Sequence, residues 1–121
     1  MKQLTIVGNL CADPDLKWGQ SGTPWCRVNV AVNTRRRTKS GEWEDGDTTF
    51  IVLKVFGKLA EKLADVTSKG DSVIATGDLE VDEWTTKDGE TRRDVVLTAR
   101  QVGLNLRWLE PTVHHQEDAP F

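Results

Sequence analysis

Hydrophobic and polar residues alternate along most of the chain, and this period of two predicts β-strands with one buried face. Five runs between residues 4 and 102 follow the pattern. In chain order their expected core positions are Leu4, Ile6 and Leu10; Val28, Val30 and Val32; Ile51, Leu53 and Val55; Val73, Ala75, Leu79 and Val81; and Val95 and Leu97. The opposite face of each strand is then free for other contacts.

One segment has helical spacing instead. Residues 58–68 repeat apolar side chains three or four positions apart, at Leu59, Ala60, Leu63, Ala64 and Val66. Lys69 and Gly70 follow, and a cation with a glycine is typical of a helix C-terminus. This segment is therefore predicted to be a helix that ends near residue 68.

Turn-forming residues separate these elements. The pairs Ser40-Gly41, Asp45-Gly46 and Asp88-Gly89 are typical of hairpins, and residues 11–25 are expected to form a loop. The order is then three strands, a helix and two more strands. It predicts an all-β fold with one helix: an OB-fold, in which a five-stranded barrel carries its helix between strands 3 and 4. A sandwich normally needs about seven strands and fits less well.

The length of 121 residues suits one domain, expected at 1–109, followed by a short tail at 110–121. No apolar run approaches the roughly 20 residues of a membrane span, and the first residues lack the apolar stretch of a signal peptide. A cytoplasmic protein is expected. Cys11 and Cys26 are then interpreted as reduced residues, with a disulfide as the alternative.

The net charge of −3 is unevenly distributed. The three excess acids, Glu110, Glu117 and Asp118, all lie in the tail, so residues 1–109 are neutral. Within them, residues 27–39 contain five cations and no acid: Arg27, Arg35, Arg36, Arg37 and Lys39. Arg35, Arg36, Arg37 and Lys39 enter the Ser40-Gly41 turn and are expected to wrap a nucleic-acid backbone. The alternative is a solvated loop whose arginines pair with the acids that follow.

Aromatic residues occur at positions that a core does not need. Phe50 and Phe56 share a face with Lys54, opposite the apolar face of their strand, and Trp84 lies on the polar face of a later strand. Outward aromatic rings beside cations suit base stacking combined with phosphate contact. The alternative is that these rings fill an oligomer interface or a second core layer.

No arrangement of residues indicates catalysis. The histidines, His114 and His115, are adjacent in the tail and lack ligating partners at metal-site spacing. The sequence contains no nucleophile–histidine–acid set and no phosphate-binding glycine loop. We therefore expect a protein that is not an enzyme and needs no cofactor or metal.

The tail ends in an acidic tip that contains a proline and a terminal aromatic residue: Glu117, Asp118, Ala119, Pro120 and Phe121. A terminal ring beside anions suits a partner pocket with an apolar floor and a basic rim. The alternative is a frayed terminus without a role.

Taken in order, several segments resemble a bacterial-type single-stranded DNA-binding protein. They are Gly8-Asn9-Leu10, Ala12-Asp13-Pro14, Phe56-Gly57-Lys58-Leu59-Ala60-Glu61, Lys69-Gly70, Val73, Gly77, Leu79, Trp84, Gly89 and the tip. Gly41-Glu42-Trp43 with Phe50 looks most like the actinobacterial branch.

The resemblance implies a homotetramer that wraps single-stranded DNA (ssDNA), together with a tip that recruits replication, recombination and repair proteins at the nucleoid. It implies base stacking on Phe50, Phe56 and Trp84 and a binding role for Lys58 and Lys69. An alternative within this interpretation is an interaction adaptor, or a specialised paralogue with weak affinity for ssDNA.

Three features depart from the family pattern. Glu80, Asp82 and Glu83 occupy a strand that is usually basic, and Arg36 replaces a stacking aromatic residue. The long linker before the tip is almost absent, since residues 110–121 extend at most about 40 Å. The first two departures bear on affinity, and the third bears on the reach of the tip.

Overall fold

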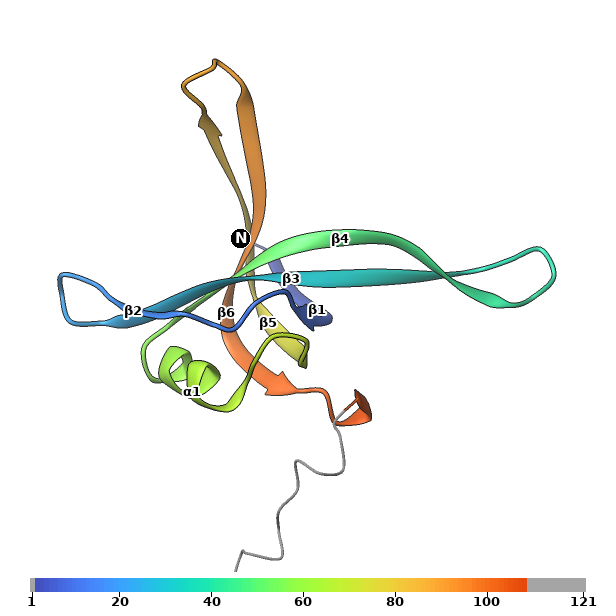
Figure 1. Ribbon diagram of the computed structural model, residues 1–121, viewed down its shortest axis with the longest axis horizontal. Coiled ribbons are helices and arrows are strands. Elements are labelled where there is room, and N and C mark those ends of the chain that lie inside the picture. Colours follow the sequence, from blue (N-terminus) through green and yellow to red (C-terminus); the bar gives the residue numbers. More distant parts are fainter. Residues whose placement is uncertain (1, 109–121) are drawn as a thin grey trace, which may run out of the picture.

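The computed structural model describes residues 2–108, which form six strands, one α-helix and one short 3-10 helix (Figure 1). In order these are β1 (Lys2–Leu10), β2 (Leu16–Trp18), β3 (Pro24–Arg37), β4 (Trp43–Phe56), α1 (Lys58–Val66), β5 (Ser72–Thr85), β6 (Thr91–Leu104) and η1 (Leu106–Trp108). No helix within this part of the chain is long and apolar enough to cross a membrane. The tail and its tip lie outside the described residues.

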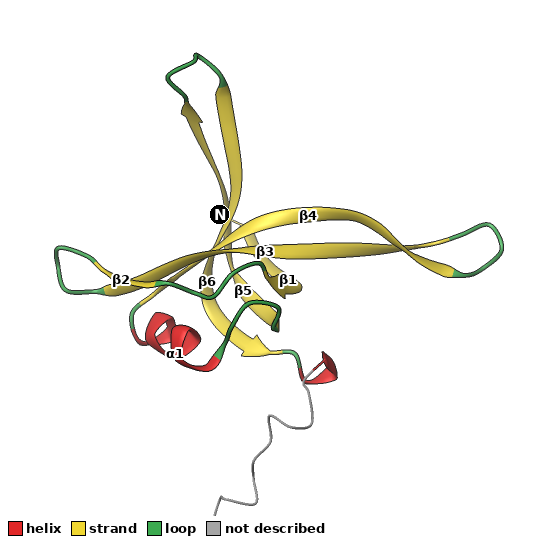
Figure 2. Ribbon diagram, viewed as in Figure 1, coloured by secondary structure: helices red, strands yellow, loops and turns green. Residues whose placement is uncertain are grey.

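The strands form one sheet that closes on itself. Their order is β1-β5-β6-β4-β3-β2, and a further pairing joins β1 to β3 through Asn9–Ala31 and Leu10–Val30. The five long strands therefore make a closed circuit, and α1 follows the third of them, β4 (Figure 2). The predicted fold class, mostly β with a single helix and an OB-fold, is confirmed.

The core lies inside this circuit and is built mainly from the predicted apolar faces. Leu53, Val55 and Val73 are fully buried, and α1 adds Ala60 and Leu63 to the same cluster. Cys26 is also buried there, and removal from water raises the pKa of its thiol. Cys11 and Cys26 are both free thiols, as the preferred interpretation expected.

Two long hairpins project beyond the barrel as arms (Figure 1). We call residues 33–48 of β3 and β4 the first arm and residues 81–95 of β5 and β6 the second arm. The prediction that Val81 faces the core is wrong: its side chain is 60% exposed, because the second arm has no layer packed against it there. Leu4 and Val66, near the ends of their elements, are likewise exposed rather than in the core.

Two predicted loop features are wrong. Residues 11–25 contain a strand, β2, which pairs with the start of β3. Asp45-Gly46 lies inside β4 rather than in a turn, because the pairing of β3 with β4 continues past it after a register shift between Asn33 and Arg35. The shift accommodates one extra residue on β4 as a β-bulge, so β4 begins as early as Trp43.

The helix also ends earlier than predicted. It finishes at Val66, and Thr67 adopts an extended conformation while its N–H donates to the carbonyl of Leu63. Gly70, which was expected to end the helix, instead lies in the turn that follows, with a φ of 93°. There its N–H donates to the carbonyl of Leu10 and ties this turn to the end of β1.

All three hairpins close with the same turn. The first residue of each turn, Gly19, Thr38 or Thr86, donates its N–H to the carbonyl four positions later. Three positions after that first residue comes a glycine with a φ between 83° and 89°. This combination is the three-residue hairpin loop that requires a left-handed residue. In both arms the turn has the sequence Thr-Lys-x-Gly-Glu, at residues 38–42 and 86–90.

A bulge in β6 changes which of its residues face the core. The pairing of β5 with β6 shifts between Thr76 and Gly77, and Arg100 is the extra residue on β6. Before the shift Leu97 and Ala99 point inward, and after it Val102 and Leu104 pack against the core. The barrel therefore keeps an apolar lining although the strict alternation is broken.

We predict that Gly77→Ala destabilises the fold. A methyl group at Gly77 would lie 2.0 Å from the carbonyl oxygen of Thr98, and this clash is with backbone that cannot rotate away. The expected loss in the free energy of unfolding is about 1–3 kcal/mol or more, measured by chemical denaturation. Gly103→Ala, which meets no atom within 4 Å, is the matched control and should change stability by less than about 0.5 kcal/mol. Equal effects of the two changes would contradict the prediction.

Candidate nucleic-acid interface

The outward face of β4 carries the predicted aromatic residues. Phe50 is 61% exposed and Phe56 is 47% exposed. The residues that alternate with them, Ile51, Leu53 and Val55, point inward and fill the core. Lys54 lies between the two rings, and its Nζ is 6.0 Å from the centroid of the Phe56 ring. We call Phe50, Lys54 and Phe56 the aromatic stripe.

The neighbouring strand β3 widens this surface. Residues directly opposite one another in a sheet point to the same face. Trp25 is opposite Phe56, Arg27 is opposite Lys54, and Ala31 is opposite Phe50. The small Ala31 leaves Phe50 open to solvent, whereas Trp25 provides a second ring beside Phe56.

The β3–β4 hairpin and the β5–β6 hairpin are joined at the centre of the outward face. Val52 of β4 lies beside Val96 of β6, and both are buried although neither belongs to the main core cluster. At the edge of this small apolar contact, the guanidinium of Arg27 lies 2.8 Å from the carboxylate of Asp94. This ion pair is partly exposed, so its contribution to stability is small and its main effect is on local charge.

The second arm differs from the stripe in charge. Trp84 is 44% exposed and lies on the same sheet face, opposite Arg92. Glu80 and Asp82 share that face, and Asp82 is directly opposite Asp94. Within residues 2–108, Glu80 and Asp82 form no ion pair. An acidic strip therefore separates Trp84 from the aromatic stripe.

The arginines of β6 do not neutralise this strip, because they pair with other acids. Arg92 contacts Glu90 at 3.2 Å, Arg93 contacts Glu83 at 3.4 Å, and Arg100 contacts Asp78 at 2.9 Å. Glu83 and Arg93 face the other side of the arm from Trp84. The cations beside Trp25 and Phe56 come from β2 and β4, whereas the cation opposite Trp84, Arg92, is paired with Glu90.

The other predicted contact residues lie in several places. Arg35, Arg36 and Arg37 end β3 in the first arm; their backbones pair with residues 43–45, and their side chains are not described. Lys39 is exposed at the tip of that arm. Lys58 begins α1, two residues after Phe56, and is exposed.

Lys69 is not on this sheet face. It lies in the loop between α1 and β5, where its N–H donates to the carboxylate of Asp13 at 2.7 Å. The structure therefore brings Phe50, Lys54, Phe56 and Lys58 together along one strand and its continuation. Trp84 lies on a separate arm.

Trp25, Lys17 and Arg27 belong to the same face and were not among the predicted contact residues. Lys17 is opposite Trp25, and its Nζ is 5.6 Å from the centroid of the Trp25 ring. The alternation of Trp25, Arg27 and Asn29 with Cys26, Val28 and Val30 was the available signal. It was missed because residue 25 fell within the predicted loop.

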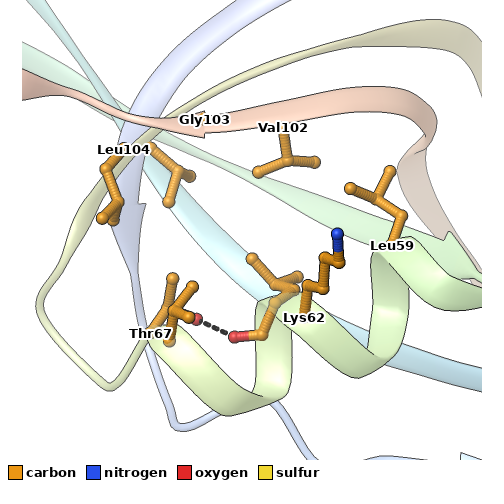
Figure 3. A pocket seen from close by; sticks show the side chains of 9 residues that line it. Leu59, Lys62, Thr67, Val102, Gly103 and Leu104 are labelled. Atoms are coloured by element: carbon orange, nitrogen blue, oxygen red, sulfur yellow. Dashed lines mark hydrogen bonds between the residues drawn. The ribbon is translucent and has the colours of Figure 1, made fainter.

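A separate concavity lies between α1 and β6 (Figure 3). Its volume is about 140 Å³, and its walls are apolar, from Leu59, Leu63 and Val66 on the helix to Val102 and Leu104 on the strand. Lys62 lines it as well, and the hydroxyl of Thr67 donates to the carbonyl of Leu63 within it. Nothing in its lining resembles a catalytic set. The described residues also contain no group of three side chains suited to a metal ion.

The closed barrel, with exposed rings and cations on one outward face, defines an OB-fold domain with a candidate nucleic-acid surface. The chain belongs to the single-strand binding protein family, whose model matches residues 1–105. This confirms the resemblance inferred from the sequence motifs.

The relatives of this chain include actinobacterial proteins. It is 35% identical to the single-stranded DNA-binding protein of Mycolicibacterium smegmatis, over 92% of this chain and 68% of that protein. It is 36% identical to the protein of the same name from Mycobacterium leprae, over 92% of this chain and 67% of that one.

A solved structure has the same fold. The crystal structure of the small single-stranded DNA-binding protein from Streptomyces coelicolor superposes with a TM-score of 0.78 at 25% identity. The match covers 88% of this chain and 95% of that one.

Proposed function

We propose that this protein binds ssDNA without sequence preference and without catalysis. The observation that carries the proposal is the aromatic stripe, in which two exposed rings flank a lysine on the outward face of β4. Every base has a π-face, so stacking on such rings tolerates any sequence. The family and the printed names of the relatives support the same function.

Phosphate contacts complete the proposed interface. Lys54 is part of the aromatic stripe and Lys58 follows it. In the first arm, beyond the Phe50 end of the stripe, we assign phosphate contacts to Arg35, Arg36, Arg37 and Lys39. Neutralising phosphates releases counterions, so affinity should fall steeply as salt rises. We assign a base-stacking role to Trp84 and a peripheral phosphate contact to Lys69.

We further propose that the protein acts in the cytoplasm, at the nucleoid, as a homotetramer. Its tip, Glu117 to Phe121, would recruit proteins of DNA replication, recombination and repair. The ring of Phe121 close to two acids, Glu117 and Asp118, suits a pocket with an apolar floor and a basic rim. This role rests on the sequence of the tip.

A second candidate function is an interaction adaptor, or a specialised paralogue with weak affinity for ssDNA. The acidic strip favours it, because Glu80 and Asp82 face the same side as the proposed stacking residues. Like charge along the DNA path raises the free energy of the complex. The two functions differ in whether the full chain binds ssDNA tightly, and in whether the tip is needed when it does not.

We predict that Phe50→Ala weakens binding to oligothymidylate. One base–ring stack contributes about 1–3 kcal/mol, so the dissociation constant should rise roughly fivefold or more at low salt. Fluorescence anisotropy of a labelled oligonucleotide measures this change. Val81→Ala is the control, because Val81 is 60% exposed, like Phe50 at 61%, but points to the opposite face of its sheet. If the wild-type chain does not bind at low salt, the proposed function is wrong.

We also predict that Glu80→Gln strengthens binding to ssDNA. The change removes one negative charge from the proposed DNA face without altering side-chain size, and the gain should shrink as salt screens it. Glu61→Gln in the first turn of α1 is a matched control with the same chemistry away from this face. Unchanged affinity for the Glu80 variant would mean that ssDNA does not pass along β5 to Trp84.

Removal of residues 117–121 should separate the two candidate functions. For the ssDNA-binding protein, we expect the truncated chain to bind ssDNA at least as tightly at low salt, because an anionic competitor is removed. It should fail to support growth in a complementation assay if the tip recruits partners. If the full chain has negligible ssDNA affinity and truncation still abolishes complementation, the adaptor is correct.

A further inference from the structure

We propose that Trp25 is a base-stacking residue and that ssDNA leaves the aromatic stripe across β3 onto the β2–β3 hairpin. The proposal rests on the proposed function but adds a residue, a direction and a phosphate contact to it. Trp25, Phe56 and Lys17 are the three side chains that carry it.

The strand register places Trp25 and Phe56 next to each other on the outward face. The two residues are a directly opposed pair, and the Cβ atoms of such pairs lie about 4.5–5.5 Å apart. The pairing is fixed at the strand ends, where the N–H of Gly57 donates to the carbonyl of Pro24 at 2.8 Å. Because the backbone on either side of this pair is hydrogen-bonded, the Cα–Cβ bonds of both residues are fixed before any ligand arrives.

Each ring has its own lysine. The Nζ of Lys17 is 5.6 Å from the Trp25 ring, and the Nζ of Lys54 is 6.0 Å from the Phe56 ring. At these distances the cations interact with the ring faces, and their exposed ends can move to a phosphate when a base takes the ring face. The two pairs, Trp25 with Lys17 and Phe56 with Lys54, could each bind one base and one phosphate, so together they suit two consecutive nucleotides.

The aromatic stripe continues in two directions, toward Trp25 and toward Trp84, and charge makes the contact toward Trp25 the tighter of the two. A strand running from β4 to Trp84 on the second arm passes Asp94, Asp82 and Glu80; within the described residues Asp94 pairs with Arg27, and the other two acids form no ion pair. A strand turning across β3 instead meets Arg27, Trp25 and Lys17. The phosphates of a DNA backbone favour the second route.

The test uses the full chain and an oligothymidylate that carries 5-iodouracil. We expect irradiation to produce a crosslink at Trp25, located by mass spectrometry of the digested complex. Trp25→Ala should raise the dissociation constant roughly tenfold at low salt, and Trp25→Phe, which keeps a ring, should restore most of the affinity. Lys17→Gln should lower the slope of log affinity against log salt by about 0.7, the loss of one phosphate contact.

Trp18→Ala is the matched control. Trp18 is the neighbour of Lys17 and is 61% exposed, but it lies on the opposite parity of the same hairpin. The Trp18→Ala chain should bind like the wild-type chain and keep the crosslink at Trp25, and Trp18 itself should not crosslink in the wild-type chain. If Trp25→Ala unfolds, the crosslink, Trp25→Phe and Lys17→Gln still decide the question.

Two results separate failure of this inference from failure of the proposed function. If the wild-type chain binds and Phe50→Ala weakens it, while Trp25 gives no crosslink and a folded Trp25→Ala binds normally, the inference is wrong and ssDNA binding stands. If the wild-type chain does not bind, the proposed function itself fails.

Discussion

The short parallel pairing between β4 and β6 is the contact on which the rest of the structure depends. It consists of three opposed pairs, from Val52–Val96 to Lys54–Thr98. It joins the two long hairpins into one sheet, and the β1–β3 pairing then closes the barrel. Because β4 carries both core residues and the aromatic stripe, the same pairing fixes the interior and the outward face together.

That outward face combines two opposed electrostatic environments. Around β2, β3 and β4 the rings have cations beside them. On the second arm Trp84 is opposite Arg92, but it lies beyond Glu80 and Asp82, which form no ion pair within the described part of the chain. The net charge of the chain therefore says little about its ligand, because the distribution of charge on one sheet face sets the local potential. The ion pair between Arg27 and Asp94 lies at the boundary between the two environments.

The fold was largely predictable because a closed barrel needs one apolar face on every long strand. Ile51, Leu53 and Val55 were assigned to the core from alternation alone, and they are buried. Alternation did not reveal β2, which has three residues, too few to show a period. It also did not reveal the bulge at Arg100, where one extra residue reverses the inward parity of β6.

The candidate site was predictable in part. Outward parity identified Phe50, Lys54 and Phe56, because their strand already had a complete apolar face. Trp25 escaped notice because its significance comes from its partner across the sheet, and cross-strand register is a tertiary property. Val81 was assigned to the core because it alternates with the core residues of its strand, but it is exposed. Whether a second layer covers such a residue depends on where the barrel ends, and alternation does not reveal this.

The shared hairpin turn has a consequence for the order of folding. Each arm is closed by local hydrogen bonds between neighbours in sequence, such as Thr38 with Glu42 and Thr86 with Glu90. The pairing of β1 with β5 instead joins Lys2 to Leu79 and so spans most of the chain. Loop-closure entropy makes such distant contacts slow to form. We therefore expect the turns that close the two arms to form early, and the pairing of β1 with β5 to form late and complete the core.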